Sequence, residues 1–359
     1  MVSVLRGPRL SLGPKMEEFE ELVCRYVGQS FGIAVSSGTA GLHLCIRALG
    51  IGAGDEVIVP SFTFVAAANA VRYEGAVPVF VDIEPTCLNL DPSLIEDAIT
   101  PRTRAIIAVH TFGCPANMQA ILEIARRHGL RVIEDACEAM GATYQNRHVG
   151  SFGDAAVFAF YPNKQITTGE GGLVVTADPQ LAREIRAMRN HGRYESGEWH
   201  QHSILGYNYR LSEIHCALGC AQMRRLPEIL ASRERVARTY GALLGDVTTL
   251  ILPSTDLTDG RISWFVYVVR LRDHFGQDQR DAIVGMLQQR GIGCGRYFAP
   301  IHTQPAYADV PLRRALPVTE SVSRRTLALP FFNRLSEEEM EQVTQTLQES
   351  IEIASRERE

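Results

Sequence analysis

The chain has 359 residues, of which 45% are hydrophobic and 21% are charged, and its formal net charge is −5. This composition predicts a globular protein with a large domain over residues 1–225 and a smaller one over residues 226–359, and it excludes the strongly basic surface that nucleic-acid binding requires. The sequence shows neither the apolar core of a signal peptide nor a run of roughly 20 apolar residues, so we expect a cytoplasmic protein without a membrane segment.

Short apolar runs alternate with helix-length amphipathic segments from about residue 30 to residue 190. This alternation is typical of βα units that build a mainly parallel sheet, and it places the protein in the α/β class. The segments predicted as buried strands are residues 32–35, 56–59, 77–81, 105–110, 131–135, 156–160 and 172–175. A helix is predicted over residues 118–129, because basic residues come late in it and Gly129 marks its end.

A long helical stretch over residues 210–226 follows, and a second helix over residues 227–244 continues it as a connector. Cys216 and Cys220 lie one helical turn apart in this stretch and could join His215 around a metal. Packing of small residues between helices explains them better, and the eight cysteines include no CxxC pair. We therefore expect reduced cysteines and no metal.

The C-terminal part predicts a small α+β domain. It begins near residue 263 with a strand over residues 264–271 and a helix over residues 277–291. The last helix opens with a capping box from Ser336 to Glu339.

The first segment with chemical content is SSGTAGLHLCIRAL, in which the strand ends at Val35 and a turn over Ser36, Ser37, Gly38 and Thr39 leads into a helix. Backbone N–H groups at the helix start and the Thr39 hydroxyl can bind an anion such as phosphate, and the glycine permits close approach. A plain helix cap by Ser37 or Thr39 is the alternative, and the segment by itself favours it.

Two carboxylates, Glu134 and Asp135, end the strand in RVIEDACEAMGA. Ligands of open α/β sheets gather at the carboxyl ends of the strands, so Asp135 is a candidate to face a bound cofactor. An aspartate that caps the next turn is an equal alternative.

Lys164 comes just after a hydrophobic strand and just before the glycine-rich turn at residues 169–172. Burial disfavours the charged form of an amine, and Schiff-base chemistry with a carbonyl cofactor needs the neutral form. The glycines could serve turn geometry alone. An anion-binding turn, the carboxylate of Asp135 and this lysine together match what pyridoxal phosphate (PLP) needs for its phosphate, its pyridine nitrogen and its aldehyde.

From about Leu10 to the C-terminus, the chain resembles the DegT/DnrJ/EryC1/StrS sugar aminotransferase family, which has the PLP-dependent transferase fold type I. The resemblance rests on SLGPKMEEFE, SSGTAGL, DEVIVPSFTFVAAANA, PVFVDIEP, IEDACEAMGA, SFGDAAVFAFYPNKQITTGEGG, GYNYRLSEIHCALG and RYFAPIHTQPAY. It implies a large domain with a mainly parallel seven-stranded sheet, a small C-terminal domain, and PLP or its amino form, pyridoxamine phosphate (PMP), as cofactor.

The resemblance also implies roles for particular residues. Lys164 would form the Schiff base and Asp135 would bond the pyridine nitrogen. Thr39, with the Ala40 backbone and the turn glycine before them, would bind the phosphate. Phe64 would stack on the pyridine ring; without the motif, a core phenylalanine would be the better interpretation.

Three further positions complete the implied site. Asn208 matches an asparagine that reaches the phosphate from the neighbouring subunit, which implies a homodimer. Arg210 and His302 match positions near the sugar nucleotide, although each could equally be structural.

The chain departs from the family pattern in three places. Ala159 stands where many members have a serine that touches the phosphate. Glu138 stands where glutamine or histidine is common near the cofactor 3′ oxygen, and its charge state is open. The segment before SLGPK is also shorter than usual.

The resemblance therefore implies transamination from an amino acid, L-glutamate, to a nucleotide-linked keto-sugar in amino-sugar and polysaccharide biosynthesis. The version ITTGEGG resembles members that aminate C4, which favours an NDP-4-keto-6-deoxyhexose. The alternatives are a C3 keto-sugar, a keto-cyclitol, or a non-catalytic PLP-binding regulatory protein. Some relatives replace the lysine with histidine and dehydrate or deoxygenate sugars, and the presence of Lys164 argues against that chemistry.

Overall fold

The computed structural model describes residues 1–194, 200–255, 257 and 260–356. Its main element is a seven-stranded sheet in the order β1-β9-β8-β5-β4-β2-β3, in which β9 alone runs antiparallel to its neighbours. The strands are β1 Phe31–Val35, β2 Glu56–Pro60, β3 Val77–Val81, β4 Thr103–Val109, β5 Arg131–Asp135, β8 Ala155–Ala159 and β9 Gly172–Thr176. The predicted mainly parallel sheet is confirmed, and every predicted strand overlaps an observed one.

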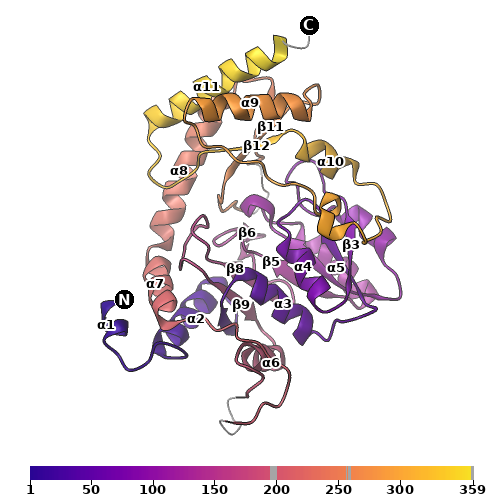
Figure 1. Cartoon of the computed structure of the whole chain (residues 1–359), viewed down its shortest axis with the longest axis vertical. Helices are drawn as coiled ribbons and strands as arrows, with labels where there is room; N and C mark the ends of the chain where they lie inside the picture. The colour runs from indigo at the N-terminus through magenta and orange to yellow at the C-terminus, as the bar shows by residue number, and fades with distance from the viewer. Residues whose placement is uncertain (195–199, 256, 258–259, 357–359) are drawn as a thin grey trace.

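Helices cover both faces of this sheet (Figure 1). One face packs against α3 Gly38–Ala48, α4 Ala66–Tyr73 and α6 Pro179–Arg189. The other packs against α2 Pro14–Val27, α5 Met118–His128 and α7 Glu213–Arg224, while α1 Val2–Leu5 contacts α7. The predicted helix over residues 118–129 is confirmed, and it ends at Gly129 with φ 64° in the left-handed region that glycine favours.

The alternation of side chains along β5 decides what its two terminal carboxylates face. Ile133 belongs to the core on the α3 side, and Val132 belongs to the core on the α5 side. Because side chains alternate along a strand, Asp135 points to the α3 side and Glu134 points to the α5 side. The adjacent acids therefore belong to different environments.

A second sheet lies at the C-terminal end of the molecule, under α9 and α11 (Figure 1). It consists of β10 Leu250–Ile251, β11 Tyr267–Leu271 and β12 Thr326–Leu329, all antiparallel. The helices of this part are α9 Gln277–Gln289, α10 Pro317–Ser323 and α11 Glu337–Arg356. The predicted capping box is confirmed, because the Ser336 N–H donates to Glu339 Oε2 at 2.9 Å and the Glu339 N–H donates to Ser336 Oγ at 3.1 Å.

The predicted strand over residues 264–271 is wrong at its start. The segment before Tyr267 leaves the small sheet and bonds to the large one's loops, where Arg261 pairs with Thr143 and the Ser263 N–H donates to Gly113 O at 3.0 Å. Within the predicted strand, Trp264 O and Phe265 O accept from Arg233 Nη1 at 3.2 and 3.1 Å, and the ladder of β11 begins at Tyr267.

Helix α8, Leu226–Leu244, connects the two parts (Figure 1). Leu226 and Ile229 belong to the core formed with α2 and α7. Val236, Tyr240 and Leu244 belong to the core formed with β11, α9 and α11. The helix therefore contributes to both cores, and the division between residues 225 and 226 stays a prediction.

The remaining elements are short. They are the hairpin β6 Thr143–Tyr144 with β7 Arg147–His148, and the 3-10 turns η1 Pro92–Leu94, η2 Glu96–Ala98, η3 Thr111–Gly113, η4 Ile301–Thr303 and η5 Pro305–Tyr307.

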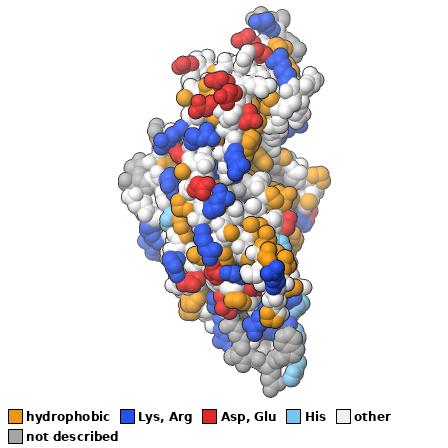
Figure 2. Space-filling model, turned by 90° about the vertical axis from the view of Figure 1, so that its left-hand side faces the viewer, with side chains coloured by type: hydrophobic (Ala, Val, Ile, Leu, Met, Phe, Trp, Pro, Cys, Tyr) orange, Lys and Arg blue, Asp and Glu red, His pale blue; other side chains and the backbone are white. Residues whose placement is uncertain are grey.

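The surface of the described chain agrees with its composition. On the face seen in Figure 2, acidic and basic side chains are interspersed and form no single basic patch. Among the described helices, none is long and apolar enough to cross a membrane. All eight cysteines are free thiols, as predicted.

Glu213 at the start of α7 holds the start of α2. Its Oε1 accepts the Gly13 and Met16 N–H groups at 3.0 and 2.9 Å, and its Oε2 accepts the Lys15 N–H at 2.8 Å. We expect Glu213→Ala to lower the free energy of unfolding by about 3 kcal/mol, because three N–H donors, two of them in buried hydrogen bonds, lose their acceptor. Urea unfolding measures this change, and Glu17→Gln in the exposed first turn of α2 is the control, with an expected change below about 0.5 kcal/mol. Equal effects of the two changes would contradict this role for Glu213.

Candidate active site

The turn before α3 packs directly on the carboxyl ends of β5 and β8. A Cβ on Gly38 would lie 2.8 Å from Cys137 Sγ and 2.9 Å from Ala159 Cβ, so only glycine fits there without a shift. The Ser37 hydroxyl caps α3 by accepting the Ala40 N–H at 3.1 Å. The helix-cap alternative is thus correct for Ser37, and it leaves Thr39 at the first turn of the helix for other contacts.

The glycine-rich turn before β9 has a packing role. A Cβ on Gly172 would lie 2.5 Å from the carbonyl of Ser37, so this glycine lets β9 pass close beneath the turn before α3. Gly169 has φ 84°, which glycine adopts without strain. Turn geometry therefore explains these two glycines.

Asp135 and Glu138 bring two carboxylates to the same strand end. Asp135 is buried, and its Oδ1 accepts the Cys137 N–H at 3.2 Å. Glu138 Oε2 accepts the Phe112 N–H at 2.9 Å. Burial raises the pKa of Glu138, and the negative charge of Asp135 raises it further, against the opposing effects of Lys164 and the Phe112 N–H.

Lys164 lies beside the second of these carboxylates, Glu138. Its Nζ is 3.5 Å from Glu138 Oε1 and 4.0 Å from the centroid of the Phe265 ring, and 14% of its side chain is exposed. The amine is thus held between a carboxylate and an aromatic face.

The other predicted cofactor residues have different surroundings. Phe64 lies just before α4, and 60% of it is exposed in the single chain. Asn208 is exposed too, but its backbone pairs with Asn190, and the adjoining Tyr209 O accepts the Ser36 N–H at 2.8 Å. The segment that carries Asn208 therefore lies beside the turn before α3 of its own chain.

The two predicted substrate residues are separately anchored. The Arg210 guanidinium donates to Asn190 Oδ1 at 3.0 Å, and its backbone pairs with Val35. His302 Nδ1 lies 2.8 Å from Ser61 Oγ, and burial lowers the pKa of this histidine. Each side chain thus has a structural partner of its own, Asn190 for Arg210 and Ser61 for His302.

Four contacts of the site were not predicted. The Phe112 N–H binds Glu138, the Phe265 ring covers the Lys164 amine, and Gln165 Nε2 donates to Glu138 O at 2.6 Å and to Ser263 O at 3.0 Å. No local pattern marked these residues, because their partners lie up to about a hundred positions away in the chain.

Glu134 supports the strand end from the opposite face of the sheet, on the α5 side where Val132 also points. Its Oε1 accepts the Phe152 and Gly153 N–H groups at 2.7 and 2.8 Å, and its Oε2 accepts the Gly150 N–H at 2.7 Å and lies 3.1 Å from His110 Nε2. Burial by itself raises the pKa of Glu134, but the bonds from His110 and these amides hold it below its ordinary value.

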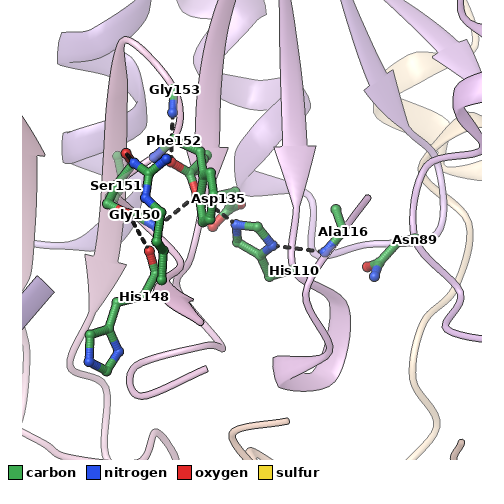
Figure 3. Close-up of polar contacts among 12 residues, drawn as sticks. Asn89, His110, Ala116, Asp135, His148, Gly150, Ser151, Phe152 and Gly153 are labelled. Carbon is green, nitrogen blue, oxygen red and sulfur yellow. Dashed lines mark hydrogen bonds and ion pairs between the residues drawn. The ribbon is translucent and has the colours of Figure 1, made fainter. Parts of the chain in front are cut away.

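His110 completes this network. Its Nδ1 accepts the Ala116 N–H at 3.0 Å (Figure 3). The ring proton therefore belongs on Nε2, which donates to Glu134. The His110 N–H also donates to Asp135 O at 3.1 Å, which ties the network to the backbone of the strand end.

Glu134→Gln is expected to lower the free energy of unfolding by about 3 kcal/mol at pH 7, because an amide cannot accept four hydrogen bonds and would oppose N–H donors with its own. The folded-state pKa of Glu134 lies below 4.5, so this contribution is present above about pH 4.5 and is lost as the pH falls through the folded-state pKa. The difference in free energy of unfolding between wild type and Glu134→Gln should therefore become smaller in acid. Urea unfolding at pH 7 and at pH 4 tests this, with the exposed Glu123→Gln as control; a gap that widened in acid would refute the assignment.

Comparison with known proteins places these observations in a family. The chain matches the model of the DegT/DnrJ/EryC1/StrS aminotransferase family over residues 1–348. GDP-perosamine synthase of Caulobacter vibrioides is 43% identical over 340 residues, which cover 94% of this chain and 90% of that protein.

Solved structures agree. S. venezuelae DesV is 39% identical with a TM-score of 0.91, over 98% of this chain and 93% of that one. The putative sugar aminotransferase Spr1654 of Streptococcus pneumoniae in its PMP form is 25% identical with a TM-score of 0.93, over 98% and 96% of the two chains. The predicted fold type and cofactor are confirmed, and the chain belongs to the DegT/DnrJ/EryC1/StrS aminotransferase family of PLP-dependent enzymes.

Proposed function

We propose that Lys164 is the residue that binds PLP and moves the proton in transamination between L-glutamate and a nucleotide-linked keto-sugar. One observation carries this assignment. The Lys164 amine lies 3.5 Å from Glu138 Oε1, at the strand end where Asp135 also points. An amine near buried carboxylates is suited to proton transfer.

The residues present fit the cofactor. The turn before α3 offers backbone N–H groups at a helix start, and Gly38 leaves the close approach that a phosphate needs. Thr39 and the Ala40 backbone would hold that phosphate, without a hydroxyl from Ala159. When bound, the cofactor supplies an aldehyde that joins an amine and a pyridine ring that accepts electron density from the carbon losing its proton.

The chain's own residues would then divide the work. Asp135, on the α3 side of β5, would bind the pyridine nitrogen and keep it protonated. Lys164 would take the proton from the α-carbon of the amino donor and deliver it to the carbon that carried the aldehyde of the cofactor. Glu138, whose carboxyl pKa is raised by burial, would lie near the 3′ oxygen of the cofactor and near the Lys164 amine.

A homodimer is part of this proposal. Phe64 and Leu205 are large apolar residues that are 60% and 68% exposed in the single chain, and Asn208 lies exposed three residues after Leu205. A second copy that covered this segment would bury them, and Asn208 would then reach the partner's phosphate site.

For the acceptor we propose an NDP-4-keto-6-deoxyhexose, with Arg210 and His302 near the nucleotide or sugar. The support is the GEGG turn together with the 43% identity to GDP-perosamine synthase, which is named for a GDP-linked product. A cytoplasmic location is proposed with it, since such substrates are soluble metabolites.

The decisive experiment maps the cofactor. The sequence has two lysines, Lys15 and Lys164, so borohydride reduction of the PLP-saturated enzyme followed by peptide mass mapping has few possible answers. We expect the reduced adduct on Lys164 and a visible absorbance band that L-glutamate shifts. An adduct on Lys15, or no band at saturation, would overturn the assignment and favour the regulatory alternative.

The acceptor is tested on enzyme first converted to its amino form with L-glutamate. GDP- and dTDP-linked 4-keto-6-deoxyhexoses should restore the visible band, and a 3-keto-sugar or a keto-cyclitol should do so far more slowly. If the 3-keto-sugar or the keto-cyclitol reacted faster, the proposed acceptor would be wrong, and the proposed role of Lys164 would be unaffected.

A further inference from the structure

Arg233, in the first half of α8, is a buried arginine that the proposed reaction does not use. Its Nη1 donates to Trp264 O at 3.2 Å and to Phe265 O at 3.1 Å, and its Nη2 donates to Lys164 O at 3.2 Å. One guanidinium therefore joins the backbone of the lysine to the backbone of the residue whose ring covers the lysine amine.

The charge of this arginine is not neutralised by a neighbouring acid. Within the described residues no ion pair involves Arg233, its Nε has no hydrogen-bond partner, and the Phe331 ring lies 5.4 Å from its guanidinium carbon. Burial lowers the pKa of Arg233 to about 10, which leaves it charged at neutral pH. A buried charge satisfied by carbonyl groups alone is costly, and such costs concentrate at functional sites.

We propose that Arg233 is a positioning residue for Lys164, which sets the distance between the lysine amine, the Phe265 ring and Glu138. This inference rests on the proposed role of Lys164. The planar guanidinium suits it, because it presents several N–H donors in a fixed geometry and can bind two backbone segments at once.

The surrounding contacts support this role. Gln165 fixes the next residue of the same segment through Glu138 O and Ser263 O, so Lys164 is held from both sides along residues 164–165 and 263–265. The Nζ distances of 3.5 Å to Glu138 Oε1 and 4.0 Å to the Phe265 centroid depend on both backbones staying in register. Because α8 contributes to both cores, Arg233 also couples the site to the C-terminal part.

The test compares Arg233→Met with Arg235→Met. Arg235 is the control. It is an exposed arginine two residues further along α8, and it also donates to two backbone carbonyls away from the site, Asn333 O at 3.5 Å and Leu335 O at 3.0 Å. The first measurement is the rate at which an acylating reagent labels Lys164 relative to Lys15, in the full-length enzyme freed of cofactor. The second is kcat and KM of the reloaded enzyme.

We expect Arg233→Met to raise the Lys164-to-Lys15 labelling ratio several-fold and to lower kcat about 100-fold with little change in KM, because a misplaced reacting group loses rate more than binding. Arg235→Met should match wild type in both. Arg233→Gln, which keeps an N–H donor, should lie between them and replaces the methionine variant if that variant does not fold.

A labelling ratio and kcat equal to those of wild type in a folded Arg233 variant would overturn the proposal, as would equal effects in Arg235→Met. The labelling ratio does not require Lys164 to be catalytic. A failure of the proposed function would instead appear as a borohydride adduct missing from Lys164 in the wild-type enzyme.

Discussion

Lys164→Ala is expected to lower kcat for transamination by about 10⁴-fold or more, because the change removes both the amine that bonds the cofactor and the group that carries the proton. The structure gives Lys164 contacts that no other amine of the chain shares, since Lys15 bonds Glu18 on the surface of α2. The rate at which L-glutamate bleaches the visible band of the cofactor in a single turnover measures the effect.

Lys15→Arg is the control, and it leaves Lys164 as the only lysine in the chain. It should keep the wild-type rate. Small primary amines added to Lys164→Ala should restore part of the rate, since a free amine can replace the missing proton carrier. Activity of the alanine variant within tenfold of wild type, without added amine, would show that another group does this work.

Asp135→Asn is expected to lower kcat by about 10²- to 10³-fold, because an amide cannot stabilise a protonated pyridine as a carboxylate does. The cofactor dissociation constant should change much less, since the phosphate turn and Lys164 remain. Stopped-flow measurement with α-deuterated L-glutamate should show a larger isotope effect than in wild type, because proton transfer becomes the slow step.

The same variant has a second expected result. The negative charge of Asp135 contributes to the raised pKa of Glu138, so any dependence of rate on the Glu138 carboxyl should move to lower pH in Asp135→Asn. Asp97→Asn, in an exposed pair with Arg314, should alter neither kcat nor this pH dependence. A loss of cofactor binding as large as the loss of kcat would contradict the assigned role.

Local sequence pattern was sufficient for most of the large sheet. Runs such as residues 77–81 and 105–109 are continuous and apolar because both of their faces are buried, and a buried parallel strand shows that signal without help from distant residues. The same holds for the helix that ends at Gly129 and for the capping box at Ser336, whose partners lie within four positions.

Part of the site could also be predicted from local sequence. Asp135 at a strand end and Lys164 before a glycine-rich turn follow from chain order and from where parallel strands end, and the structure brings both to the strand end where Glu138 lies. The roles of Phe64, Asn208, Arg210 and His302 rest on the resemblance, and their contacts in one chain do not decide them.

Tertiary packing alone settled the rest. The strand β11 starts at Tyr267 because Trp264 O and Phe265 O bond to the side chain of Arg233 in α8 rather than to a neighbouring strand. The same dependence on distant residues explains why the sequence did not indicate three residues of the site, Arg233, Phe265 and Phe112. Hydrogen bonds and ring contacts between residues far apart in the chain depend on how the helices and sheets pack, and a periodicity of two or of 3.6 residues carries no information about them.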